Sequence, residues 1–182
     1  MSLKKSQLES YQNEVVGGLE ALPRKVIKNK HFSPENYIGG GQSKLRYLGL
    51  KVPLVRDFYR KGFSFSQRTD SDQLKIWTHI WENSGQFEAM ACALYWLESH
   101  EDPKAHQATL ISWVNSIDNW GHSDGMSAFY AAFLENDPKS FWPVIHSWST
   151  SSNPWKRRQS LVSLYYYSRL REKPIPVRLA LP

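Results

Sequence analysis

Two short segments of the sequence hold residues whose types and spacing could support chemistry. The first runs from Trp120 to Asp124. Side chains four residues apart share one face of a helix, so an indole and a carboxylate would project side by side here. Both groups favour a positive charge, and the pair therefore suits a site where a cation develops. The alternative is that Trp120 packs in the core and Asp124 is a solvated or capping acid.

The second segment is Trp155-Lys156-Arg157-Arg158, which follows an Asn-Pro pair typical of a helix start. Successive helical side chains are about 100° apart, so the three cations cannot all face one way. Arg158 lies three residues after Trp155, on the same side of the helix. Its guanidinium could hold a phosphate through two parallel hydrogen bonds. The alternative is an ordinary exposed basic turn.

The elements that must position these segments are predicted to be helices. Apolar residues recur at spacings of three and four from Leu74 to Trp81 and again from Phe87 to Tyr95, with Ser84-Gly85 between them. A second helix pair is predicted from Pro103 and a third from Asp137-Pro138, since proline suits a first helical turn. Pairs therefore begin near residues 71, 103 and 138.

The spacing of these starts, 32 and 35 residues, is typical of helical repeats that bury their apolar faces by stacking. We therefore predict an all-α fold, an α-α superhelix of antiparallel helix pairs. The repeats resemble one another poorly, so an irregular helical bundle remains the alternative. Ahead of them, helices are expected at residues 3–17, around 20–30, and from Pro53 after a loop at 39–41.

The composition is that of one ordinary domain spanning residues 1–182, with 41% hydrophobic and 22% charged residues. A single cysteine, Cys92, excludes an internal disulfide, and no targeting leader or apolar run of about 18 residues is present. We expect a cytoplasmic monomer without membrane association. The six histidines include no pair spaced for a metal ion, so we expect neither a metal nor another cofactor.

Charge is distributed in three blocks around a net value of +6. Residues 1–69 carry 13 Lys/Arg against 5 Asp/Glu, residues 70–138 carry 2 against 11, and residues 139–182 carry 8 against 1. Two basic flanks around an acidic centre could follow the phosphates of duplex DNA. The alternative is that these cations only solvate helix surfaces.

Four segments in register resemble the DNA alkylation repair glycosylase family (AlkD-like), whose members are built from HEAT-like repeats. In chain order they are an early aromatic and Leu-Gly motif (Lys44–Pro53), a Trp followed by a Glu/Phe-rich helix start (Ile80–Ala89), an Asn-Trp segment (Asn119–Asp124) and a Trp-x-x-Arg segment (Trp148–Arg158). The resemblance covers about residues 36–171.

The resemblance implies excision of cationic N3- or N7-alkylated purines from duplex DNA in base excision repair, without flipping the base into a pocket. Carried over residue by residue, the family's site falls on Trp120 and Asp124 as catalytic residues and on Arg158 as a DNA contact. We expect further contacts to damaged duplex DNA from neighbouring and early basic or aromatic residues, namely Arg157, Lys156, Trp155, Lys44, Arg46 and Lys51.

The chain departs from the family in two places. Gly121 stands where the family often has an acid, and the sequence looks short at its C-terminus, without the family's closing Gly-Trp-x-x-Arg helix. These departures favour the alternative of a non-catalytic relative that binds DNA structure, which would release no base. A third possibility is a helical-repeat adaptor for peptides, which would show no DNA affinity even at low salt.

Overall fold

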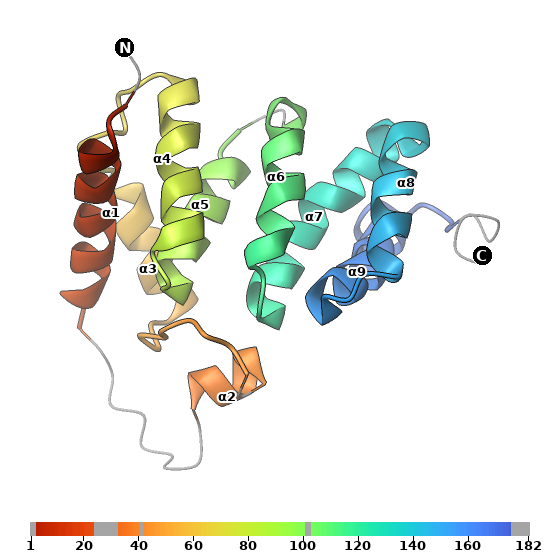
Figure 1. Ribbon diagram of the computed structural model, residues 1–182, viewed down its shortest axis with the longest axis horizontal. Helices are drawn as coiled ribbons and strands as arrows, with labels where there is room; N and C mark the ends of the chain where they lie inside the picture. Colours follow the sequence, from red (N-terminus) through yellow and green to blue (C-terminus); the bar gives the residue numbers. More distant parts are fainter. Residues whose placement is uncertain (1–2, 24–32, 41, 101–102, 176–182) are drawn as a thin grey trace. The chain divides into compact units, whose positions relative to one another are not determined.

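A computed structural model describes residues 3–23, 33–40, 42–100 and 103–175 of the protein (Figure 1). Within these ranges the regular structure is helical, apart from one isolated bridge between Arg46 and Gln86. The predicted all-α class is therefore confirmed. The chain divides into two compact units, Met1–Glu101 and Asp102–Pro182, and each is described by itself.

Unit 1 is built around the predicted pair of helices, which pack against each other, while a first helix packs on both of them. Its helices are α1 (Lys5–Glu20), α2 (Pro34–Gly39), α3 (Val52–Arg60), α4 (Asp70–Asn83) and α5 (Phe87–Glu98). The helices predicted at 3–17, at Pro53 and at the pair are confirmed. The helix expected around 20–30 falls mostly on residues outside the described part, and the short α2 was not predicted.

The core of unit 1 forms where α4 meets α5. Ile76, Trp77, Ile80 and Trp81 of α4 are each at most 1% exposed. They pack with α5, most of whose residues are buried. Leu74, which fits the same periodic pattern, is only half-buried. The apolar period therefore predicts three of the four buried residues of α4, includes Leu74 wrongly and misses Ile76.

Glu88 joins the early motif of the sequence to the start of α5. Its carboxylate is 2% exposed and accepts hydrogen bonds from the backbone N–H of Leu48 at 3.0 and 3.1 Å and of Leu50 at 3.3 Å. Next to it, Arg46 N–H donates to Gly85 O at 2.9 Å and Phe87 N–H donates to Arg46 O at 3.0 Å. Hydrogen bonds thus connect two of the four motifs, Lys44–Pro53 and Ile80–Ala89, in a contact that we call the Glu88 joint.

Unit 2 holds the two segments that could support chemistry. Its elements are the 3₁₀ turns η1 (Pro103–His106) and η2 (Val114–Ser116) and the helices α6 (Gln107–Trp113), α7 (Trp120–Asn136), α8 (Pro138–Ser149) and α9 (Pro154–Leu170). The predicted starts near 103 and 138 are confirmed. α7, α8 and α9 pack against one another, and the Tyr130 hydroxyl ties α7 to α6 by donating to Leu110 O at 2.6 Å.

Local capping explains where the helices of unit 2 begin. Asn119 caps α7 by accepting from His122 N–H at 2.8 Å, Asp137 caps α8 by accepting from Ser140 N–H at 3.2 Å, and Asn153 caps α9.

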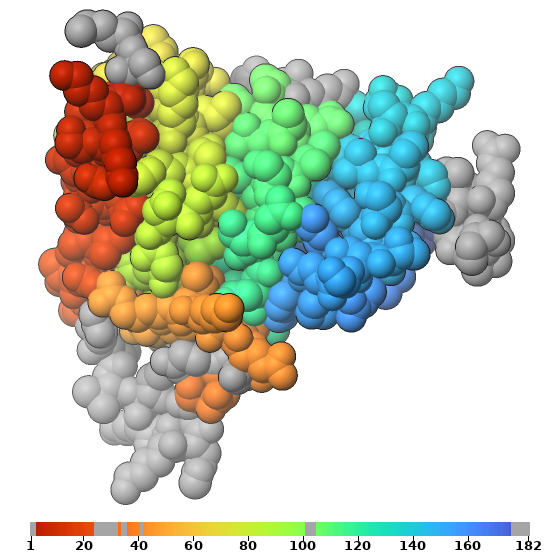
Figure 2. Space-filling model, viewed as in Figure 1, coloured from red at the N-terminus to blue at the C-terminus, as the bar shows by residue number. Residues whose placement is uncertain are grey.

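Side chains of α8 and α9 fill the space between their ribbons and form a continuous surface (Figure 2). Among the described residues, no helix is long and apolar enough to cross a membrane.

Candidate functional site

Trp120 and Asp124 occupy the first two turns of α7. Because Asn119 caps the helix, Trp120 is its first residue and Asp124 follows one turn later on the same face. The side chain of Asp124 is 32% exposed, and Trp120 is half-buried. Neither is sealed in the core, so a molecule in solution can reach both.

Arg158 of α9 meets Asp124 of α7. Its Nη2 lies 2.8 Å from Asp124 Oδ1, and its Nη1 donates to Ser123 Oγ at 2.6 Å. Both members of the ion pair are 32% exposed. Asp124 Oδ2 has no hydrogen-bond partner among the described residues. A guanidinium has five N–H donors. The pair thus offers a carboxylate oxygen and a cation with spare donors at one surface.

A buried polar cluster lies directly behind this pair, between α7 and α9. Ser123, Ser127, Gln159 and Ser163 are each 0% exposed. Ser123 Oγ donates to Gln159 Oε1 at 2.9 Å, and Gln159 Nε2 donates to Ser127 Oγ at 2.7 Å and Ser163 Oγ at 3.1 Å. None of these four residues was predicted to belong to the site. The sequence signal that could have indicated them is a pair of polar residues four apart on each helix, at 123 and 127 and at 159 and 163. These positions lie on helix faces that packing would otherwise make apolar.

Tyr166, two turns after Arg158 on α9, also belongs to this neighbourhood. Burial raises the pKa of its phenol, the negative charge of Asp124 raises that pKa further, and the positive charge of Arg158 partly opposes both effects. The residue is half-buried. It stands in a run of three tyrosines, and sequence alone does not indicate which of them faces the pair.

The remaining predicted residues of unit 2 surround the start of α9. Arg157 is exposed and donates to the carbonyls of Ser151 at 2.7 Å and Ser152 at 3.0 Å, so it closes the loop before its own helix. Trp155 and Lys156 are half-buried. Of the three consecutive cations, Arg158 is the one that contacts the α7 site, as the 100° rotation per residue requires.

Three predicted DNA contacts, Lys44, Arg46 and Lys51, belong to unit 1. All three are exposed. Arg46 forms an ion pair with Glu20 of α1, and Lys51 is the N-cap residue of α3. All three lie in the segment 44–51, whose backbone donates hydrogen bonds to Glu88 and Gly85.

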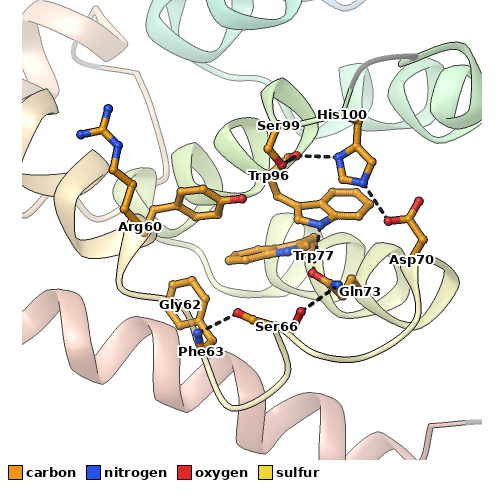
Figure 3. A pocket seen from close by; sticks show the side chains of 11 residues that line it. Arg60, Gly62, Phe63, Ser66, Asp70, Gln73, Trp77, Trp96, Ser99 and His100 are labelled. Atoms are coloured by element: carbon orange, nitrogen blue, oxygen red, sulfur yellow. Dashed lines mark hydrogen bonds and ion pairs between the residues drawn. The ribbon is translucent and has the colours of Figure 1, made fainter.

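Unit 1 also contains a cavity of about 370 Å³ at the ends of α3, α4 and α5 (Figure 3). Four of its polar side chains pair with one another: Trp96 Nε1 donates to Gln73 Oε1 at 3.1 Å, and His100 Nε2 lies 2.7 Å from Asp70 Oδ1. Trp77 and Trp96, at 1% and 3% exposed, present little ring surface to a ligand. The cavity contains none of the predicted site residues.

Comparison with known proteins bears on the α7 and α9 site. Residues 23–175 match the family model described as DNA alkylation repair enzyme. The matched range contains all four motifs and every predicted site residue. No curated protein sequence matches the chain, and no solved structure matches it.

Proposed function

Because the chain belongs to the DNA alkylation repair enzyme family, we propose that it is a DNA glycosylase that removes cationic N3- or N7-alkylated purines from duplex DNA. The observation that carries the proposal is Asp124, which is one-third exposed, lies one helical turn from Trp120 and is held at 2.8 Å by Arg158. Such a site combines a carboxylate for a developing cation with a cation for a phosphate.

The reaction needs little help from an acid, since a positively charged purine is already a good leaving group. The C1′–N bond breaks, its electron pair neutralises the base, and positive charge develops on the deoxyribose. Asp124 stabilises that charge and orients a water molecule, whose oxygen bonds to C1′ and whose proton passes to the carboxylate or to solvent. Trp120 packs against the sugar and shields the cation. The products are the free base and an abasic site.

Arg158 has a separate role in this proposal. The N–H groups that do not engage Asp124 or Ser123 bind a phosphate next to the lesion and set the register of the DNA. Trp155, Lys156 and Arg157 of unit 2 add contacts to the backbone, and the basic residues 44, 46 and 51 of unit 1 do the same. The substrate base stays outside a protein pocket, and selectivity comes from the lability of its bond.

We further propose that residues 1–182 form a single domain of HEAT-like repeats. The regular succession of helix starts at Asp70, Pro103 and Pro138 supports this architecture. The packing of α4 on α5 and of α8 on α9 supports it as well, since each repeat of this kind is a helix pair.

The test is an assay of base release from methylated duplex DNA by the parent and by Asp124→Asn. We expect the parent to release N3- or N7-methylpurine and the variant to do so about 100-fold or more slowly, the usual cost of losing one group that stabilises transition-state charge. Asp57→Asn, an exposed acid of α3, is the control and should match the parent.

Three results would contradict the proposal, each in a different way. Equal rates for the parent and Asp124→Asn would remove Asp124 from the mechanism. Tight binding of duplex DNA without any base release would indicate a non-catalytic DNA-binding relative. No affinity for DNA even at low salt would indicate a protein adaptor.

A further inference from the structure

In the buried polar cluster behind Arg158, the hydrogen bonds determine which group donates and which accepts. Ser127 Oγ donates to Ser123 O at 2.8 Å, and Ser163 Oγ donates to Gln159 O at 2.7 Å. A hydroxyl has one proton, so both hydroxyls can only accept from the Gln159 side chain. The amide nitrogen of Gln159 must therefore face Ser127 and Ser163.

This orientation of the amide fixes the hydroxyl of Ser123. Gln159 Oε1 faces Ser123 and takes its only proton at 2.9 Å. Ser123 Oγ then presents only lone pairs to Arg158, whose Nη1 donates to it at 2.6 Å. If the Gln159 amide were flipped, both its nitrogen and Arg158 Nη1 would donate to Ser123 Oγ. The hydroxyl proton of Ser123 would then have no acceptor, which is costly in a fully buried site.

We propose that Ser123 and Gln159 are positioning residues, which hold the Arg158 guanidinium where its Nη2 contacts Asp124 and its remaining N–H groups face an incoming phosphate. The phosphate and the reaction rest on the proposed function. The orientation of the guanidinium does not, because it is a property of the protein without DNA. Ser123 and Gln159 act through Arg158 and touch no reacting atom.

A matched pair of variants separates this role from a merely structural one. Ser123→Ala and Ser163→Ala each delete one buried hydroxyl that bonds to the Gln159 side chain, from α7 in the first case and from within α9 in the second. Only Ser123 also contacts Arg158. We expect similar losses of melting temperature, but only Ser123→Ala should weaken binding of methylated duplex DNA, by about tenfold for one lost hydrogen bond to a charged group. Equal binding by the two variants would overturn the proposal.

The second readout needs neither DNA nor activity. In ¹⁵N-labelled protein, rotation about the Cζ–Nη1 bond of Arg158 should be slow in the parent and in Ser163→Ala, and fast in Ser123→Ala, where Nη1 loses its acceptor. Free rotation in the parent would refute the positioning role even if the protein proved an active glycosylase. Slow rotation in a parent that releases no base would refute the proposed function and leave the positioning role intact.

Gln159→Glu adds a test by pH. The new carboxylate can accept from Ser123, but it has no proton for Ser127 or Ser163 until it is protonated. The free energy of unfolding of the variant should therefore increase relative to that of the parent as the pH falls, because protonation restores a donor to Ser127 and Ser163. A difference in unfolding free energy between variant and parent that stays constant with pH would contradict the assigned proton directions.

Discussion

Arg158 and Asp124, 34 residues apart in the sequence, meet with Nη2 2.8 Å from Oδ1, while Arg158 Nη1 engages Ser123 at 2.6 Å. Both members of the ion pair are about one third exposed, so solvent screens it. Exposed pairs of this kind stabilise a fold by about 0–1 kcal/mol. Substitutions in the pair should therefore alter function far more than stability, and the two can be measured apart.

Arg158→Lys should weaken DNA binding although it keeps the positive charge. A guanidinium contacts Ser123 and Asp124 through two nitrogens and still has donors for a phosphate, whereas an ammonium is a single point charge. We expect the dissociation constant for duplex DNA to rise about tenfold, with a change in stability below about 1 kcal/mol. Binding titrations and thermal melts measure the two effects. Arg169→Lys, elsewhere on α9, should bind like the parent, and equal affinities for all three proteins would contradict the expectation.

Glu88→Ala should destabilise unit 1. The substitution leaves the buried backbone N–H groups of Leu48 and Leu50 without their acceptor. Losing hydrogen bonds to a buried charged group costs about 2–4 kcal/mol here. Urea unfolding measures the loss, and Glu82→Ala, an exposed position on α4, serves as control. Coincident unfolding curves for the two variants would show that the carboxylate does not hold the joint.

Two adjacent glycines of α1 should respond oppositely to alanine. A Cβ at Gly18 would lie 2.6 Å from Phe58 Cζ, whereas a Cβ at Gly17 meets nothing within 4 Å. Gly18→Ala should cost about 1–3 kcal/mol through overpacking, and Gly17→Ala should stabilise by about 0.5–1 kcal/mol because alanine favours the helix. Calorimetric melting of both variants tests this, and equal shifts would mean that Phe58 moves aside freely.

Much of the helix order could be predicted because its signals are local. Thr69, Asn119, Asp137 and Asn153 cap helices through their own next few residues, and such contacts need no knowledge of the fold. The six-residue α2 was missed because a helix that short carries too few residues for an apolar period.

The site could be predicted only in part. Trp120 and Asp124 follow from a spacing within one helix. The Arg158 contact and the Ser123–Gln159 bond depend on how α7 and α9 are rotated against each other, which no local pattern records. Gln159, on an interior face of its helix, illustrates the difficulty: a polar residue there is interpretable only once its partners on the other helix are known.

Cys92 should make the stability of unit 1 fall at high pH. Burial raises the pKa of its thiol far above the ordinary value of 9.0, with a smaller contribution from the charge of Glu88. Above about pH 9 the unfolded thiol loses its proton while the folded one keeps it, so the folded state binds more protons and the free energy of unfolding decreases with pH. The stabilisation is complete below that pH and is lost progressively above it, by up to about 1.4 kcal/mol per pH unit.

Cys92→Ala isolates this effect, because it removes the thiol and leaves every other titrating group in place. Urea unfolding of parent and variant between about pH 9 and 10 should give a steeper decline for the parent. Tyr130, whose phenol pKa burial raises well above 10.0, titrates alike in both proteins and cancels from the difference. Parallel declines would mean that the thiol ionises in the folded protein, and therefore that water reaches the interior of α5.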